Sequence, residues 1–349
     1  MTRRLVINWL VPEPFPGAGG DTGLFRIIRY FAEFGHECRV YVVAYNLMND
    51  YNTDQVREYV RKHFGPTPAQ YYRWRGSVED ADVTFATFWP TAENVLSLPN
   101  GGRRYYLVQD FEPSFYPHEP HHYERAENTY RAGFHCITLG RWLAKLLRER
   151  YGAKADYFDF AVDTKTYWPR RRLNDTRRRV CFYARPATPR RAYELGLKTF
   201  ALVKDRLPEV DIVFYGAREL SPELPFSVIN RGLLSQDELA TLFSHCDVGV
   251  VFSLSNPSFV ALEMMACRCA VVEIASERLE GILTHGRDAW LVEPNPQSAA
   301  AGIIELLQNK NLHDILVQNA YERTRMMSWR DSVRQIEAIL LRDPKAGAG

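Results

Sequence analysis

The sequence has almost no net charge, few cysteines and no long apolar run. Its 44 basic and 42 acidic residues give a formal net charge of +2, whereas nucleic-acid-binding domains usually concentrate a strong basic excess on one face. The six cysteines lie mostly inside apolar segments and lack the paired Cys-x-x-Cys spacing of a zinc site. We therefore expect no nucleic-acid partner, no bound metal or cofactor, and the reduced cysteines of a cytoplasmic protein.

Several catalytic motifs are also missing. The sequence contains no Gly-x-Ser-x-Gly elbow, no Walker loop and no His-Glu-x-x-His motif, which argues against the common hydrolases and P-loop enzymes. Near the start, Asn8 and Pro12 interrupt a short apolar run, so we expect a first strand there and neither a signal peptide nor a membrane span. The histidines 118, 121 and 122 lie in a Pro-rich segment, for which we expect a solvated loop.

Short apolar runs alternate with polar turns and helical patterns along the chain. The expected strands are residues 5–11, 37–45, 81–87, 103–111, 134–140, 178–186, 210–216, 246–253 and 269–274. Such alternation predicts parallel sheets covered by helices, and 349 residues suit two domains of this kind. The fold class is therefore α/β, with two Rossmann-like domains facing a cleft.

Composition also suggests where the domains divide. The segment PRRRLNDTRRR has no apolar periodicity and carries two arginine triplets, as expected of a linker. We place an N-terminal domain at 1–165, the linker at 166–179 and a C-terminal domain at 180–328. The tail KAGAG is expected to be disordered.

A cationic loop follows the first strand of the second domain. Arg185 comes just after the strand, and Arg190 and Arg191 precede a helix that is expected to start near Tyr193. Ligands of open α/β sheets bind at the carboxyl ends of strands, and arginine forks match phosphate oxygens. These arginines therefore predict a phosphate site; a solvated, cationic loop is the alternative.

A second loop of this domain leads into an apolar helix. The turn signal Asn256-Pro257 is followed by Ser258, a suitable helix cap. Glu263 lies on this helix among apolar residues and would need a partner if buried, which a ribose diol could supply. An exposed helix carboxylate is the other reading.

Glycines and acidic residues stand at the corresponding places of the first domain. A loop spanning 16–23 holds Gly17, Gly19, Gly20 and Gly23 and could cradle a phosphate or a sugar, or simply permit tight packing of strand and helix. Gln109, Asp110 and Glu112 follow another strand and could bond the hydroxyls of an acceptor, with Asp110 as a candidate catalytic group. Capping of the next turn is an equally common use of an aspartate such as Asp110.

Most of the chain resembles a known enzyme superfamily. Segments 137–169, 182–196 and 235–272, taken in order, resemble retaining GT-B glycosyltransferases related to sucrose and glycogen synthases. Within that superfamily, segments 7–31 and 105–143, the latter containing QDFEP, resemble bacterial rhamnosyltransferases that build surface glycans from dTDP-rhamnose. The final segment, 329–349, resembles the superfamily's last helix, which crosses back to the N-terminal domain, followed by the tail.

The resemblance implies roles for individual residues. Arg185 and Arg190 match an arginine and a lysine that bind the donor diphosphate, with the lysine replaced by arginine. Glu263 matches a ribose-binding glutamate, whereas Ser255 stands where a first glutamate is usual. The rhamnosyltransferase-like members also carry a Pro-Ser pair, here Pro257 and Ser258. The donor site is accordingly expected to include Gly19, Gly20, Arg185, Arg190, Ser255, Pro257, Ser258, Phe259 and Glu263.

The resemblance further implies a metal-independent reaction with retention of the anomeric configuration. The expected partners are a nucleotide-sugar donor and a glycan or lipid-linked glycan acceptor. The protein would work in the cytoplasm, and association with the inner face of the cell membrane is a further expectation. UDP- or GDP-sugars are alternative donors. A nucleotide-sugar epimerase and a non-catalytic glycan-binding protein are rival readings, the latter because of Ser255.

Overall fold

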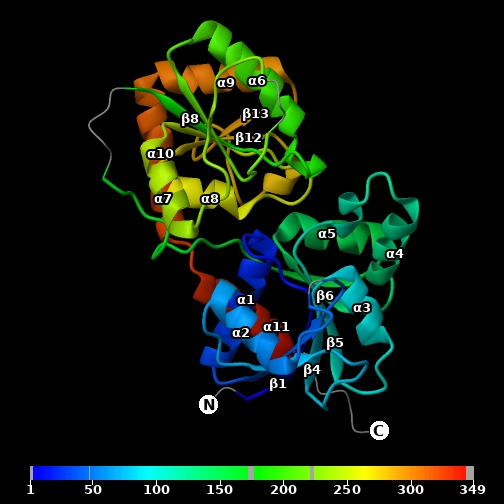
Figure 1. The fold of residues 1–349 in the computed structure, drawn as a ribbon. Helices are drawn as coiled ribbons and strands as arrows, with labels where there is room; N and C mark the ends of the chain where they lie inside the picture. The colour runs from blue at the N-terminus through cyan, green and yellow to red at the C-terminus, as the bar shows by residue number, and fades with distance from the viewer. Residues whose placement is uncertain (1–2, 47, 172–176, 221–223, 343–349) are drawn as a thin grey trace. The chain divides into compact units, whose positions relative to one another are not determined.

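The computed structural model describes residues 3–46, 48–171, 177–220 and 224–342. The chain divides into two compact units. Unit 1 combines Met1–Asp159 with Arg330–Gly349, and unit 2 is the continuous stretch Phe160–Trp329. Figure 1 shows the consequence for unit 1, where the red helix α11 (Trp329–Arg342) lies among the blue helices from the start of the chain.

Unit 1 is built on a parallel sheet of seven strands in the order β3-β2-β1-β4-β5-β6-β7. The strands are β1 (Val6–Pro12), β2 (Glu37–Val43), β3 (Gln70–Arg73), β4 (Val83–Ala86), β5 (Arg103–Val108), β6 (His135–Leu139) and β7 (Lys154–Phe158). The order changes direction between β1 and β4, so the turns after these two strands flank the crevice where such sheets bind ligands.

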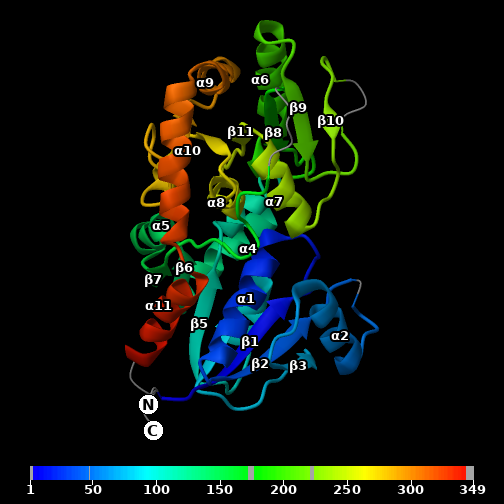
Figure 2. The ribbon, with the colours of Figure 1, turned by 90° about the vertical axis from the view of Figure 1, so that its left-hand side faces the viewer.

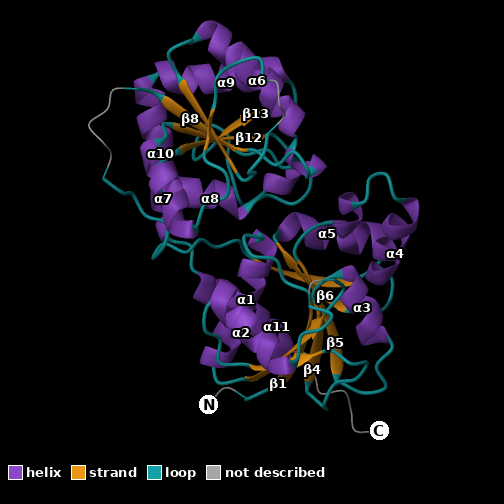
Figure 3. Cartoon of the chain, in the orientation of Figure 1, coloured by secondary structure: helices purple, strands orange, loops and turns teal. Residues whose placement is uncertain are grey.

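Helices cover both faces of this sheet, with α1, α2 and α11 on one side and α3 and α4 on the other (Figure 3). The helices are α1 (Gly19–Glu33), α2 (Thr53–Phe64), α3 (Trp89–Leu96), the 3₁₀ turn η1 (Glu112–Phe115), α4 (Pro120–Tyr130) and α5 (Arg141–Tyr151). Because both faces are covered, the central strands β1, β4 and β5 are mostly apolar. On one face Trp9 stacks on Phe85 at 4.3 Å and contacts Phe31 of α1 at 5.5 Å between ring centroids.

Helix α11 is fastened to unit 1 by a buried polar pair. His36 Nε2 lies 2.9 Å from Glu337 Oε1, and both side chains are buried. The N–H of Leu5 donates to His36 Nδ1 at 3.1 Å, so the ring proton sits on Nε2 and is donated to Glu337. Arg334 bonds the other oxygen of Glu337 and lies over the ring of Phe34 at the end of α1.

Unit 2 repeats the architecture with a parallel sheet of six strands in the order β10-β9-β8-β11-β12-β13. Its strands are β8 (Arg179–Tyr183), β9 (Asp211–Tyr215), β10 (Ile229–Asn230), β11 (Val248–Val250), β12 (Ala270–Ile274) and β13 (Trp290–Val292). Its helices are η2 (Pro189–Arg191), α6 (Tyr193–Arg206), α7 (Gln236–His245), α8 (Phe259–Ala266), η3 (Glu277–Leu279), α9 (Pro296–Gln308) and α10 (Lys310–Arg325). Figure 2 shows α6, α9 and α10 around this sheet. Here the order changes direction between β8 and β11.

The structure moves the first crossing between units upstream of the expected linker, 166–179. Unit 2 begins at Phe160, because the following segment is anchored to α7. Tyr167 is buried and stacks on Phe243, and the N–H of Arg170 donates to Ser244 Oγ at 2.9 Å. Residues 172–176 of the expected linker and the expected disordered tail, 345–349, lie outside the described residues.

Two local expectations are corrected. Helix α1 already begins at Gly19, inside the loop expected at 16–23, since Asp21 in its first turn accepts the N–H of Phe15 at 2.9 Å. His121 and His122 belong to the first turn of α4 and not to a loop, and His122 Nδ1 lies 2.7 Å from Glu119. All six cysteines are free and buried, as expected. No helix in the described part of the chain is long and apolar enough to cross a bilayer.

Candidate functional site

The turns at the direction change of the second sheet carry the cationic loop. Arg185 follows β8, and its Nη1 lies 3.4 Å from the hydroxyl of Tyr183, the last residue of that strand. Its guanidinium carbon lies 5.7 Å from the centre of the Tyr183 ring. A 3₁₀ turn then presents Arg190 and Arg191, and α6 begins at Tyr193, as expected. All three arginines are partly exposed, so they can meet an anion.

The loop after β11 is bonded directly to this cationic loop. The N–H of Leu254 donates to the carbonyl of Arg190 at 2.9 Å, and Arg191 Nη1 donates to Ser253 Oγ at 2.8 Å. The two loops that flank the direction change are thus joined through backbone and side chain. They form one continuous rim at the position where open α/β sheets bind ligands.

Helix α8 begins at the end of this rim. Ser258 is its N-cap, as the sequence indicates, and its Oγ accepts the N–H of Val260 at 3.4 Å. Glu263 lies one turn further and is partly exposed. The positive end of the helix and the three arginines are the electrostatic features that favour a phosphate.

The remaining predicted donor residues on this rim have mixed environments. Ser255 and Pro257 are buried. Leu254, which directly precedes Ser255, is 43% exposed. Phe259 packs its ring against Phe160 and Trp329 at 5.4 and 5.2 Å, so it has a packing role within unit 2. Donor contacts by these residues and by Glu263 stay predictions.

One residue at the end of the cationic loop has an unusual backbone. Ala192, the N-cap of α6, has φ 46° and ψ 46°, the left-handed region that non-glycine residues seldom adopt. The N–H of Ala192 donates to the carbonyl of Pro189 at 3.0 Å, which closes the 3₁₀ turn. This geometry ends the turn abruptly and starts α6, so Arg190 and Arg191 stay on the loop.

In unit 1, the start of α1 and the loop after β5 lie together. A Cβ added to Gly20 would come within 3.7 Å of the Gln109 side chain, whereas one on Gly19 would meet nothing within 4 Å. Burial raises the pKa of the nearby Asp21 to about 6, against the lowering effect of its bond from Phe15. The structure therefore brings the predicted residues Gly19, Gly20 and Gln109 to one place.

Asp110 bonds the backbone of the next residue, whereas the following 3₁₀ turn η1 has Phe111 as its N-cap and no side-chain cap hydrogen bond. The Oδ1 of Asp110 accepts the N–H of Phe111 at 2.8 Å, while Asp110 stays partly exposed. Contact with an acceptor hydroxyl remains a prediction for both Gln109 and Asp110.

Glu112, in contrast, is not placed for acceptor contact, and the expectation from the sequence is corrected. It is 3% exposed, and its Oε2 accepts the N–H of Trp89 at 2.7 Å and the hydroxyl of Tyr106 at 2.5 Å. Tyr130 donates nothing to the carboxylate; its hydroxyl accepts the N–H of Glu112 at 3.1 Å. Burial raises the pKa of Glu112 to about 8, more than these bonds lower it. Its role is to hold the start of α3.

Sequence reasoning missed several residues of the rim. Tyr183 and Tyr215 stack at 5.5 Å beneath Arg185, and Ser253 and Glu273 support the loop after β11. Two signals could have found them. Tyr183 and Tyr215 both end strands that adjoin each other in the sheet, and Glu273 is the sole charged residue of an apolar strand, AVVEI.

Three comparisons place this geometry among known proteins. Residues 178–304 match the family model described as WsaF, C-terminal domain. The chain is 36% identical over 265 residues to O-antigen biosynthesis protein RfbC of Myxococcus xanthus. This match covers 74% of the chain but only 21% of that relative.

Solved structures resemble nearly the whole chain. Sucrose-phosphate synthase from Thermosynechococcus elongatus has a TM-score of 0.77 at 14% identity, covering 96% of this chain and 98% of the other. Anabaena HepE in complex with UDP-glucose has a TM-score of 0.73 at 13% identity, covering 97% and 99%. TarM has a TM-score of 0.78 at 9% identity, covering 98% and 99%. The chain therefore has the GT-B glycosyltransferase fold, and residues 178–304 within its second unit are similar to the WsaF C-terminal domain.

Proposed function

We propose that the protein is a glycosyltransferase that moves a sugar from a nucleoside diphosphate to a glycan of the cell surface. The observation that carries the proposal is the cationic rim of unit 2, where Arg185, Arg190 and Arg191 adjoin the start of α8. The similarity to an O-antigen biosynthesis protein supports the surface glycan. The fold shared with HepE, solved with UDP-glucose, supports a nucleotide-sugar donor.

In the proposed reaction, the cationic rim would stabilise the leaving group. A departing nucleoside diphosphate gains negative charge, and the guanidinium groups of Arg185 and Arg190 would bond its oxygens. The N-terminus of α8 would add a favourable dipole, and Glu263 would accept the hydroxyls of the ribose. With retention of configuration, the acceptor hydroxyl attacks from the leaving-group face and a phosphate oxygen takes its proton. No protein nucleophile and no metal ion are then required.

For unit 1 we propose contact with the acceptor. Gln109 lies beside the start of α1, and both Gln109 and the next residue, Asp110, are partly exposed. Amide and carboxylate groups can bond sugar hydroxyls. A lipid-linked glycan presented at the inner face of the membrane is the acceptor that suits a surface polysaccharide.

As the donor we propose dTDP-rhamnose, on the basis of the QDFEP segment and the pair Pro257-Ser258. The methyl group of this 6-deoxy sugar requires an apolar wall. In unit 2, Leu254 is the exposed apolar side chain on the rim; in unit 1, Phe15 is 51% exposed beside the start of α1. A methyl pocket discriminates by only ~1–3 kcal/mol, so dTDP-glucose should bind more weakly but measurably.

Purified protein should be melted with dTDP-rhamnose, dTDP-glucose, UDP-glucose and GDP-mannose, because a ligand of the folded state raises the melting temperature. Transfer should then be measured with a rhamnose-containing acceptor. We expect the largest shift and turnover with dTDP-rhamnose. Efficient transfer from a UDP- or GDP-sugar with none from dTDP-rhamnose would refute the donor. Binding without turnover of any donor would favour the non-catalytic reading that Ser255 raises.

A further inference from the structure

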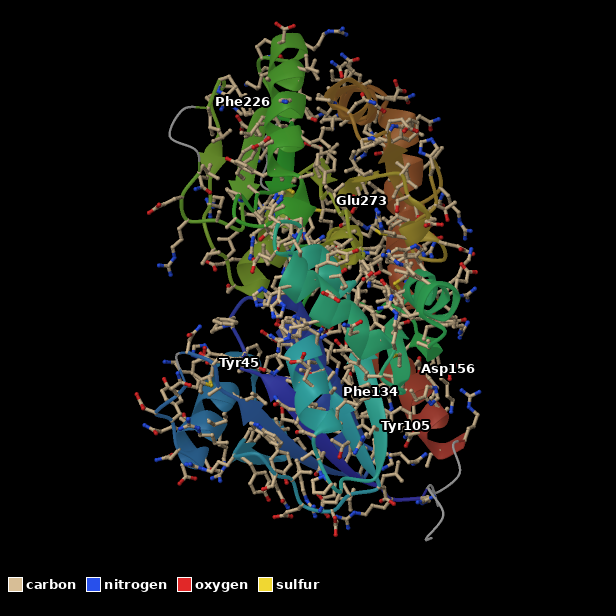
Figure 4. All side chains as sticks on the ribbon, turned by 90° about the vertical axis from the view of Figure 1, so that its right-hand side faces the viewer. Tyr45, Tyr105, Phe134, Asp156, Phe226 and Glu273 are labelled. Carbon is tan, nitrogen blue, oxygen red and sulfur yellow. The ribbon has the colours of Figure 1, made fainter. Side chains whose placement is uncertain are left out.

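Unit 2 contains a buried carboxylate that the proposed function does not use. Glu273 lies in β12, which pairs with β11 on one side and β13 on the other, and it is 0% exposed. Figure 4 labels it among the strands of unit 2. The other residues of the strand are Ala270, Val271, Val272 and Ile274. An apolar residue would fit such a strand without the cost of removing a carboxylate from water.

The contacts of Glu273 point to the loop after β11. Its Oε1 accepts the N–H of Ser253 at 2.9 Å and that of Ile274 at 2.8 Å. Its Oε2 is also buried and has no hydrogen-bond partner among the described residues. Burial raises the pKa of Glu273 to about 7, and the charge of Arg191 acts in the opposite direction. The carboxylate is thus buried despite the cost of removing it from water, and one of its oxygens accepts the backbone N–H of Ser253.

Ser253 is the residue through which this carboxylate reaches the cationic loop. Its N–H is held by Glu273, and its Oγ accepts from Arg191 Nη1 at 2.8 Å. The next residue, Leu254, donates its N–H to the carbonyl of Arg190 at 2.9 Å. A displacement of Ser253 would therefore move a side-chain contact of Arg191 and a backbone contact of Arg190 together.

We propose that Glu273 is a positioning residue for the donor diphosphate, acting through Ser253 on Arg190 and Arg191. The inference rests on the proposed function, since it concerns the same rim. Glu273 touches no substrate itself; its oxygen sets the distance between the loops after β8 and β11. Arg191 becomes, through this chain of contacts, a second oriented cation beside Arg190.

Two substitutions of Glu273 separate positioning from mere packing. Glu273→Gln keeps an oxygen that can accept both N–H groups, whereas Glu273→Leu fills similar space without an acceptor. The probes are dTDP and UDP, titrated by calorimetry into the full-length protein. For Glu273→Leu we expect the Kd of the nucleotide that binds the wild type to rise about tenfold, the equivalent of one lost hydrogen bond. For Glu273→Gln we expect a Kd within about threefold of the wild-type value, since the hydrogen bonds are kept.

Ser253→Ala provides a second test that leaves the buried carboxylate in place. It leaves the backbone N–H for Glu273 and removes the hydroxyl, which interacts with Arg191 and with the Glu273 carboxylate. The Kd should therefore again rise, by about three- to tenfold. Wild-type Kd values in both Glu273→Leu and Ser253→Ala would overturn the positioning role. Equal weakening by Glu273→Gln and Glu273→Leu would also overturn it. If the wild type binds neither dTDP nor UDP, the proposed donor site itself fails, which is a different outcome.

Discussion

The two units share a strand order at their centres but differ in the charge that they present there. After β8, unit 2 places Arg185, Arg190 and Arg191, whereas the turn after β1 of unit 1 leads to Asp21 and the loop after β5 to Asp110. Both units nevertheless share one buried feature. A buried carboxylate holds a backbone N–H at the loop of a neighbouring strand, Glu112 in unit 1 and Glu273 in unit 2. The support is common to both units, and the exposed charge is what distinguishes the ligands that we propose for them.

The largest effect should come from removing a cation of unit 2. Arg185→Ala should lower turnover by about 10²–10³, the cost of losing one preorganised donor to a developing anion. The control is Arg287→Ala, since Arg287 is an exposed arginine of the same unit outside the rim. Steady-state kinetics and a melting curve for each variant check the prediction. Turnover of Arg185→Ala equal to that of the control would remove Arg185 from the site.

Glu263→Gln should weaken nucleotide binding about tenfold, because an amide offers one accepting oxygen to the two ribose hydroxyls. Its partly exposed position on α8 should leave the melting temperature unchanged. Calorimetry with dTDP measures the affinity. An unaltered Kd would return Glu263 to a structural role and leave the arginines as the whole donor site.

The buried carboxylate of unit 1 should make stability depend on pH. Burial raises the pKa of Glu112 from 4.5 to about 8, so between these values the folded protein binds more protons than the unfolded one. The contribution of Glu112 to the free energy of unfolding is therefore fully present below pH 4.5. It is lost as the pH rises toward 8, by up to ~1.4 kcal/mol per pH unit. Glu112→Gln removes this titration while keeping an acceptor for the N–H of Trp89.

The measurement is the difference in melting temperature between Glu112→Gln and the wild type, taken from pH 5 to pH 8. We expect the melting temperature of the variant to rise steadily relative to that of the wild type as the pH increases. A difference that is constant across this range would mean that Glu112 stays ionised in the folded protein. That result would break the parallel with Glu273.

A smaller effect is expected from the acceptor side of unit 1. Asp110→Asn keeps an oxygen for the N–H of Phe111 and removes the charge, so the KM for the acceptor should rise by about three- to tenfold, as for one weakened hydrogen bond. The Kd for dTDP should not change. If instead nucleotide affinity falls and the acceptor KM does not, the division of ligands between the units is wrong.

No effect is expected from chelation. EDTA should leave transfer intact, because arginines take the place of a metal ion at the diphosphate. The assay is transfer from the donor identified by the binding screen, with and without EDTA. Loss of activity that magnesium or manganese restores would show that the cationic rim does not suffice.

The sequence predicts the centres of both sheets better than their edges. Strands such as β1 and β5 are covered on both faces, so most of their residues are apolar or aromatic. The edge strands β3 and β10, in contrast, are short and carry polar or exposed residues, QYYR and IN, which no periodicity marks as strands. The sequence predicts a linker at 166–179 and misses that Tyr167 and Arg170 belong to unit 2, because their contacts with α7 join residues more than 70 positions apart.

The candidate site follows the same logic. Arg185, Arg190 and Ser258 could be found because turns after strands and caps before helices are local signals. The burial of Glu112 could not, since it depends on Tyr106 and Trp89 meeting it from two other elements. Glu273 shows the converse, a charge inside an apolar strand whose partner, Ser253, lies twenty residues earlier in the chain.

The order of elements along the chain has a consequence for synthesis. Unit 2 is continuous, so all of its strands leave the ribosome before α11 does. Unit 1 is interrupted, and its His36 stays without Glu337 until α11 has been made. Domains generally fold as units during synthesis. Unit 2 can therefore complete its core at a stage when α11 does not yet cover its part of the unit 1 sheet. A nascent chain stalled before residue 330 should therefore protect unit 2 from protease before it protects unit 1.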